Sequence, residues 1–141
     1  MEDAGKSGFK ILNIVLMDSS FKRVDNVHLA TGDGVKNNVD ITTGYNLNGN
    51  MLVCNLTVNY TFIHNEIQEV EAKIVMVGVF EKIGDTDLKI DSFGQINAPS
   101  IIFPYIREHL TSLSVKAGVN PVVLAPVNFV AMAKPEEKKI D

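Results

Sequence analysis

The sequence has little of the chemistry that crosslinks a fold or holds a chain in a membrane. Its 141 residues include one cysteine, Cys54, and no tryptophan. A single thiol cannot form an internal disulfide, and this low cysteine content is typical of a reducing compartment. The apolar runs fall well short of the ~20 residues that a membrane-spanning helix needs. The acidic N-terminus leads into no signal core. We therefore expect a cytoplasmic protein without membrane insertion.

The sequence also lacks a cluster of positive charge. It has 13 Lys and Arg against 17 Asp and Glu, a net charge of −4. Binding to nucleic acid requires a basic face, because its affinity comes from neutralising many phosphates at once. The lysines here are interleaved with acids, so nucleic acid is not an expected partner.

Catalytic and metal-binding patterns are missing as well. His28, His64 and His109 are isolated in the sequence, whereas zinc needs three or four converging ligands. Cys54 falls on the apolar parity of an alternating segment, which indicates a buried thiol and not an electropositive nucleophile. The loop Thr31-Gly32-Asp33-Gly34 has neither the lysine of a phosphate-binding loop nor the spaced acids of a calcium loop. We expect no enzyme, no metal and no cofactor.

The first half of the chain has the patterns of β-strands. Residues 9–17 are apolar on both parities, which predicts a strand covered on both faces. Residues 24–37 are rich in Gly, Asn and Asp and are predicted to form a long loop. Alternation then predicts strands over residues 39–47, 52–62 and 67–81, with turns at Asn48-Gly49-Asn50 and residues 64–66.

The second half of the chain has a helical period followed by an apolar segment. Ser100 is the predicted N-cap of a helix over residues 101–116, with Pro104 in its first turn and Gly118 as its stop. An apolar connector follows over residues 122–129, and a short helix is expected to begin near Ala125-Pro126 and to end before Pro135.

The order of these elements predicts the fold class α+β in a single domain over residues 1–141. It consists of a four-stranded antiparallel sheet followed by one long helix, an apolar connector and a short C-terminal helix. Residues 1–7 and 135–141 are expected to be flexible.

Apolar residues exceed the need of one sheet and one helix. Val75, Val77 and Val79 lie on the outer parity of the fourth strand, and the helix stripe and the connector add to them. Two interpretations remain open: a well-filled core, or subunit interfaces together with an exposed apolar groove.

Two blocks of the sequence carry a family resemblance. Phe103-Pro104-Tyr105 is followed by Arg107-Glu108, and further on by Leu124-Ala125-Pro126-Val127-Asn128-Phe129. In this order and spacing, they resemble the SecB family of protein-export chaperones. The resemblance implies an ATP-independent holdase that binds non-native polypeptides in long apolar grooves. It also implies a homotetramer, a dimer of dimers with the long helices between the sheets.

The resemblance assigns residues to both kinds of surface. The client-peptide groove would be lined by Val24, Val27, Leu29, Val39, Ile41, Val127, Phe129 and Met132. The oligomer interface would comprise Ile102, Tyr105, Ile106, His109, Leu110 and Leu113.

The chain departs from the family where its members dock on the translocase motor SecA. Asp18 matches one position of the acidic docking patch, whereas Lys22 and Lys73 stand where acids are expected. Two reversed charges weaken an interface that is based on charge complementarity. Client holding is therefore favoured over delivery to SecA. A non-export partner such as an antitoxin remains an alternative, as does a small-ligand binding α+β protein.

Overall fold

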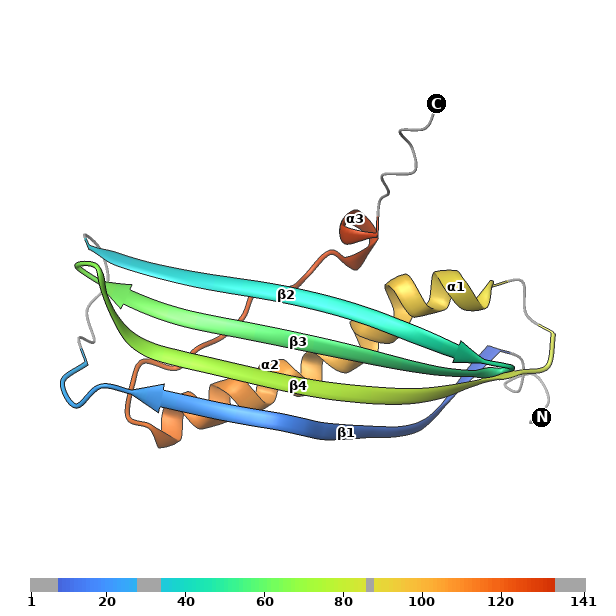
Figure 1. The fold of residues 1–141 in the computed structure, drawn as a ribbon, viewed down its shortest axis with the longest axis horizontal. Helices are drawn as coiled ribbons and strands as arrows, with labels where there is room; N and C mark the ends of the chain where they lie inside the picture. Colours follow the sequence, from blue (N-terminus) through green and yellow to red (C-terminus); the bar gives the residue numbers. More distant parts are fainter. Residues whose placement is uncertain (1–7, 28–33, 86–87, 134–141) are drawn as a thin grey trace, which may run out of the picture.

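Four long strands form one antiparallel sheet. The computed structural model describes residues 8–27, 34–85 and 88–133. The strands run in the order β1-β4-β3-β2, so β1 and β2 are the two edges (Figure 1). Their bounds are Gly8–Arg23 for β1, Val35–Asn48 for β2, Met51–His64 for β3 and Ile67–Ile83 for β4. With the helices described below, the predicted fold class is confirmed.

Strand β1 differs from its prediction in length and in burial. It continues to Arg23, and β2 begins at Val35, so the predicted loop over residues 24–37 is too long. The prediction that β1 is covered on both faces is wrong for the single chain. Leu12 and Met17 are 41% and 63% exposed. The apolar pattern of β1 did not predict this exposure, because β1 is an edge strand with a neighbour on one side only. Leu12 and Met17 also lie at the two register shifts of β1 against β4.

The two hairpin turns form as predicted. Gly49 adopts a positive φ of 65° between β2 and β3. Asn65 and Glu66 adopt φ values of 51° and 68° between β3 and β4. Positive φ at both central residues belongs to a turn whose twist matches the flanking strands. These short turns fix the register of the three strands β2, β3 and β4.

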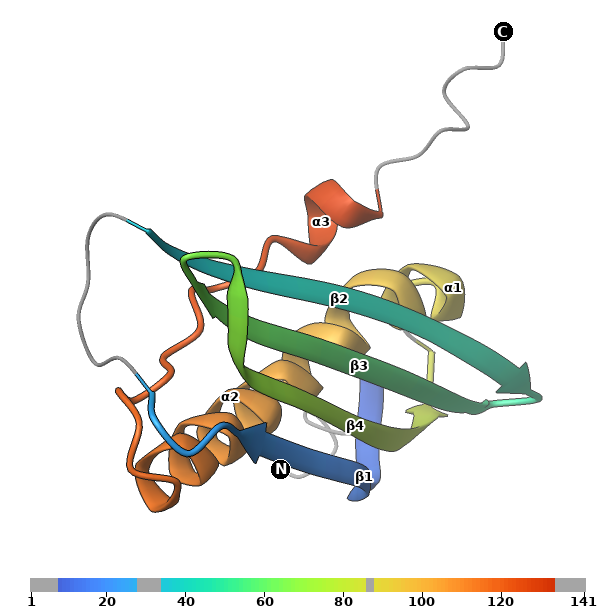
Figure 2. The same cartoon turned by 60° about the vertical axis from the view of Figure 1, so that its left-hand side comes forward.

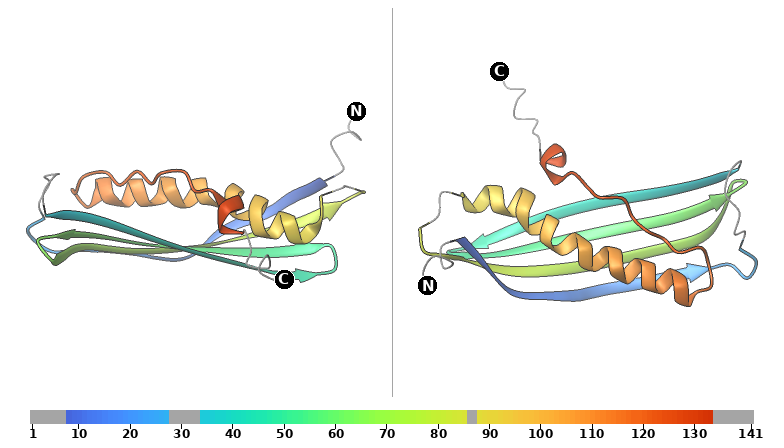
Figure 3. Two further views of the ribbon diagram at one scale, coloured as in Figure 1. Left: turned by 90° about the horizontal axis from the view of Figure 1, so that it is seen from above. Right: turned by 180° about the vertical axis from the view of Figure 1, so that it is seen from behind.

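The helices lie on one face of the sheet (Figure 3). Helix α1, Ile90–Ser92, the π-helical turn η2, Phe93–Asn97, and helix α2, Ala98–Lys116, follow each other directly. The predicted start at residue 101 is therefore wrong, and Ser100 is not an N-cap; its hydroxyl donates to the carbonyl of Ile96, 2.6 Å away. Pro104 accordingly lies inside the helix.

A glycine explains why helical structure begins so early. A Cβ at Gly94 would meet the Tyr45 ring at 2.7 Å and the Leu52 side chain at 2.9 Å. Only a residue without a side chain lets η2 lie this close to the sheet. Propensity alone predicts a poor helix here, because Gly disfavours helix interiors. Tertiary packing decides the conformation instead.

The core lies between the helices and the two central strands. Leu52, Cys54, Leu56 and Val58 of β3 are almost fully buried, and the prediction that Cys54 is a core residue is confirmed. Burial raises the pKa of the Cys54 thiol. The even-numbered side chains of β4 continue this layer, which α2 covers; the α2 side chains in the core are Ile102, Phe103, Ile106 and Leu110.

The chain returns along α2 after the helix ends. The connector runs beside α2 on the same face of the sheet and leads to α3, Phe129–Met132, near β2 (Figures 1 and 3). The Oδ1 of Asn128 accepts a hydrogen bond from the N–H of Ala131 at 3.0 Å, which caps α3. The short helix therefore begins at Phe129, later than Ala125-Pro126. Figure 2 shows the sheet, α2 and the connector turned by 60° from the view of Figure 1.

The Gly94 contact makes a stability prediction. We expect Gly94→Ala to lower the free energy of unfolding by about 1–3 kcal/mol, because the new Cβ overpacks the contact with Tyr45 and Leu52. Urea denaturation measures the difference. Gly44→Ala is the matched control, since its Cβ would meet Asn55 at an ordinary 3.6 Å. Equal stability of the two variants would contradict the close-approach argument.

Candidate functional site

A pocket opens at the end of the sheet where the β1–β2 connection leaves it. Its volume is about 210 Å³. It is lined by Val27, which follows β1, by side chains of the strands, and by the connector that follows α2. The lining residues are Val27, Val35, Asn37, Tyr60, Phe62, Val70, Val119, Asn120, Pro121 and Val122. Most of these side chains are apolar, so the pocket suits an apolar group with few specific polar demands.

The strand wall of the pocket contains one satisfied polar pair. The hydroxyl of Tyr60 donates to Oδ1 of Asn37 at 2.6 Å, and burial raises the pKa of Tyr60. This bond crosses from β3 to β2, which are paired at this point. The phenol is thus neutral at physiological pH, and its ring contributes apolar surface to the pocket.

Two hydroxyl groups of α2 hold the connector wall. The Oγ of Ser114 accepts from the N–H of Val122 at 2.8 Å, and the Oγ1 of Thr111 donates to the carbonyl of the same residue. Thr111 and Ser114 are three residues apart and so lie on one side of the helix. Together they bind both the N–H and the carbonyl of Val122. Val122 and Leu124 are buried, and residues 119–122 are left to line the pocket.

The predicted groove residues divide into several environments. Val27 lines the pocket. Val24, Val39 and Met132 are 40%, 45% and 46% exposed. Those that are partly buried against the core are Ile41 and Val127. Leu29 lies outside the described residues.

Phe129, a predicted groove residue, is buried in the single chain. Its side chain is 3% exposed and meets the Phe103 ring edge-on, with centroids 6.1 Å apart. It therefore packs in the core of the single chain. The sequence did not distinguish the two roles, because an aromatic residue at the end of an apolar connector suits both.

Sequence reasoning missed several pocket residues. Tyr60, Phe62 and Val70 share one face of their strands with the core residues, and the alternation predicted no role in a pocket for them. Helix α2 ends at Lys116. The connector residues Val119 and Asn120 line the pocket together with these strand residues. The signal that could have found the pocket is the excess length of the strands over the single helix.

The predicted interface residues on α2 point in two directions. Ile102, Ile106 and Leu110 are each 0% exposed. In the single chain they are core residues, and their interface role stays a prediction. Tyr105 is 52% exposed, and Leu113 is partly exposed. His109 is also partly exposed, and its Nε2 lies 2.9 Å from the Ser19 Oγ.

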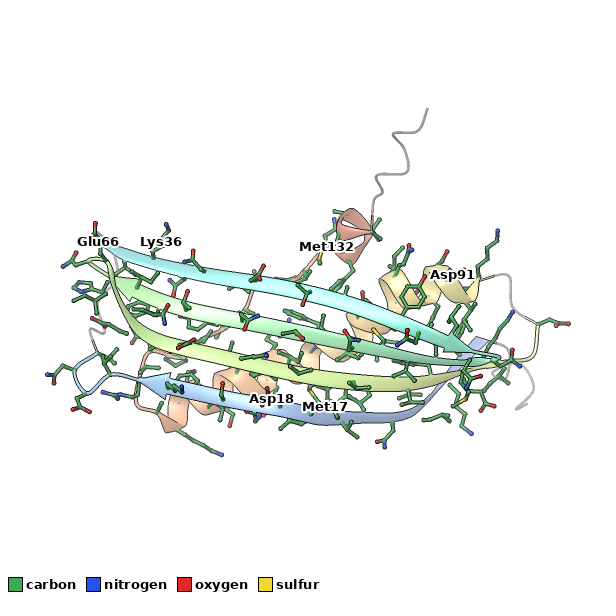
Figure 4. The ribbon with its side chains drawn as sticks, in the orientation of Figure 1. Met17, Asp18, Lys36, Glu66, Asp91 and Met132 are labelled. Carbon is green, nitrogen blue, oxygen red and sulfur yellow. The ribbon has the colours of Figure 1, made fainter. Side chains whose placement is uncertain are left out.

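The sheet face opposite the helices carries the charged positions. Asp18 pairs with Val75, Ser20 with Lys73, and Lys22 with Glu71 across β1 and β4. Direct cross-strand partners share a face, so all these side chains lie on this outer face. Asp18 and Met17 are neighbours on β1 in Figure 4. Val75, Val77 and Val79 are only partly exposed there, yet no described element of the chain covers them.

Within residues 8–27, 34–85 and 88–133, no three His, Cys, Asp or Glu side chains lie together as metal ligands. No helix in these ranges is long and apolar enough to cross a bilayer.

A twisted four-stranded sheet with one long helix and a returning connector on one face defines the SecB-like fold. A solved structure of the SecB-like chaperone of Mycobacterium tuberculosis, in complex with a peptide from an antitoxin, has this fold. It superposes with a TM-score of 0.68 at 14% identity, over 86% of this chain and 91% of that chain. The chain belongs to the SecB family: the family described as preprotein translocase subunit SecB matches residues 2–139.

Curated relatives carry the same name. The chain is 32% identical over 95 residues to protein-export protein SecB 2 of Francisella tularensis subsp. novicida. It is 33% identical over 100 residues to protein-export protein SecB of Legionella pneumophila. These alignments cover 67% and 70% of this chain, and 64% and 62% of the relatives' own lengths.

The connector wall makes a second stability prediction. We expect Ser114→Ala to lower the free energy of unfolding by about 1–3 kcal/mol, because it leaves the buried N–H of Val122 without its acceptor. Hydrogen exchange should show faster exchange of that amide. Ser112→Ala, on the partly exposed side of the same helix, serves as the control. If the Val122 amide exchanged no faster in Ser114→Ala, this hydrogen bond would not be what holds the connector.

Proposed function

We propose that the protein is an ATP-independent chaperone, a holdase that binds non-native polypeptide. The observation that carries this proposal is the apolar pocket between the β1–β2 connection and the connector after α2. A mostly apolar pocket makes few specific polar demands on its occupant, which suits a binder of unrelated clients. The family membership supports the same role.

The neighbouring edge of the sheet suggests how a client would lie. Strand β2 has 14 residues and pairs with β3 on one side only. An extended polypeptide can add to such an edge through main-chain hydrogen bonds, which need no particular sequence. Val39 and Ile41 follow Val35 on the pocket side of β2. Several weak contacts along one client then add up through effective concentration.

We propose a homotetramer, a dimer of dimers. Edge strand β1 leaves Ile11 and Leu16 nearly half exposed, and Tyr105 stands out from α2. Apolar groups on a free edge favour association with another strand. The interface would thus use β1 and the exposed residues Tyr105, His109 and Leu113 of α2.

The proposed function involves no catalysis and no cofactor. A holdase lowers the concentration of free unfolded chain by binding alone, so it needs no nucleotide and no metal. We place it in the cytoplasm, in line with the single cysteine.

Delivery of clients to SecA is the less supported part of the family role. Lys22 and Lys73 share the outer face with Asp18, and they reverse the charge that a docking surface for SecA would need. A non-export role is the alternative within the family. The solved complex with an antitoxin peptide shows that a protein of this fold takes such a partner.

Client binding makes the third prediction. Val27→Asp should weaken binding of an unfolded, alkylated model polypeptide about tenfold, because the pocket would then hold an unpaired charge. Fluorescence titration measures the affinity. Val123→Asp is the control, since Val123 is 73% exposed and outside this pocket.

If the unmodified protein bound no unfolded chain at micromolar concentration, the holdase proposal would be wrong. Co-purification of a metabolite would instead favour a small-ligand protein.

Assembly makes the fourth prediction. Light scattering should return four times the 15.5 kDa mass of one chain. Leu16→Glu should reduce this mass, because it places a charge on the exposed apolar edge of β1. Asn13→Glu is the control. Asn13 pairs with Val79 on the outer face of the sheet, so this variant should leave the mass unchanged. A single-chain mass for the unmodified protein would contradict the tetramer.

A further inference from the structure

We propose that Arg23 is a positioning residue that holds two walls of the apolar pocket at a fixed separation. The inference rests on the proposed function of that pocket. Arg23 is the last residue of β1, where the chain leaves the sheet toward the β1–β2 connection. Its side chain is the point at which this connection and the end of α2 are joined.

The guanidinium group of Arg23 makes three hydrogen bonds to main-chain carbonyls. Its Nε donates to the carbonyl of Val24 at 2.9 Å, and its Nη2 donates to the carbonyl of Asp25 at 2.7 Å. Its Nη1 donates to the carbonyl of Ala117 at 2.7 Å, 94 residues away in the sequence. A planar guanidinium has donors in a fixed fork, so these bonds set one geometry for all three acceptors.

The end of α2 provides a suitable acceptor. Gly118 has a φ of 75°, and its N–H donates to the carbonyl of Val115. The N–H of Val119 returns to the carbonyl of Ser114. This ending satisfies the earlier carbonyls and leaves that of Ala117 for Arg23. The negative end of the helix dipole strengthens a bond from a cation at this place.

The segments on either side of this link both contribute to the lining of the pocket. Val27 follows Asp25 by two residues, and Val119 follows Ala117 by two residues; both line the pocket. Val70, the cross-strand partner of Arg23, lines it as well. The N–H of Val24 donates to the carbonyl of Glu69, so the start of the β1–β2 connection is anchored to the sheet. Arg23 therefore links the segment after β1 to the end of α2 through main-chain carbonyls, and the apolar side chains of the pocket are not needed for this link.

Preorganised walls mainly slow the release of a bound chain. A pocket whose walls drift apart must be reordered at each binding event, and differences between related complexes are found largely in the dissociation rate. Arg23→Met keeps the length of the stem and removes every donor. We expect it to raise the dissociation rate of a labelled, alkylated unfolded polypeptide about tenfold, with the association rate within about twofold.

Three measurements separate positioning from a merely structural role. In the protein without client, Arg23→Met should speed amide exchange at residues 24–27 and 117–122, while β3 keeps its protection. Lys22→Met, the preceding residue on the opposite face, should change neither exchange nor release. Arg23→Lys keeps a cation that can reach a carbonyl, and its dissociation rate should fall between those of the unmodified protein and Arg23→Met.

The outcomes distinguish this inference from the proposed function. Faster release together with local exchange supports the positioning role. A release rate within about twofold of the unmodified protein overturns it, as does exchange that rises equally throughout the sheet. If Arg23→Met does not fold, Arg23→Lys decides by the same two readouts. If the unmodified protein binds no unfolded chain, the holdase proposal fails, and the exchange at residues 24–27 and 117–122 still tests the link.

Discussion

The contact between one helix and two strands determines most of this structure. Ile102, Ile106 and Leu110 of α2 are fully buried against the inner side chains of β3 and β4. One helix is about 10 Å wide, whereas four strands spaced at about 4.8 Å form a wider sheet. A single helix therefore seals the two central strands and leaves the edge strands partly uncovered. The partial exposure of the apolar side chains of β1 follows from this mismatch in width, and the pocket lies where the strands extend beyond the end of α2.

Local patterns predicted the central strands well and the edges poorly. Strand β3 alternates between Leu52, Cys54 and Leu56 inside and polar residues outside, so both its face and its turns could be predicted. Strand β1 is apolar on both parities, which predicted burial, but its exposure depends on its place in the sheet order. Sequence gives the period of a strand and not its neighbours. The early start of the helices was missed for a related reason: Gly94 is unfavourable in a helix by propensity and necessary by packing.

The candidate site could be predicted only in outline. The apolar surplus and the family resemblance indicated a groove, and one of the predicted groove residues, Val27, lines the pocket. Phe129 was assigned to the groove, although it packs on Phe103. An apolar residue near the end of a connector suits a core and a binding surface equally well. Which role it has depends on a long-range contact that no local pattern contains.

The means of holding the pocket walls bears on its function. A wall could be fixed by packing apolar side chains against each other, but that would consume the surface needed for a client. Here Thr111 and Ser114 hold the connector through the polar groups of one residue, Val122, and Arg23 binds main-chain carbonyls. Hydrogen bonds to the backbone constrain position without covering side chains. Val27 and Val119 consequently remain available in the pocket, and a protein that binds by apolar contact keeps its apolar contacts for its clients.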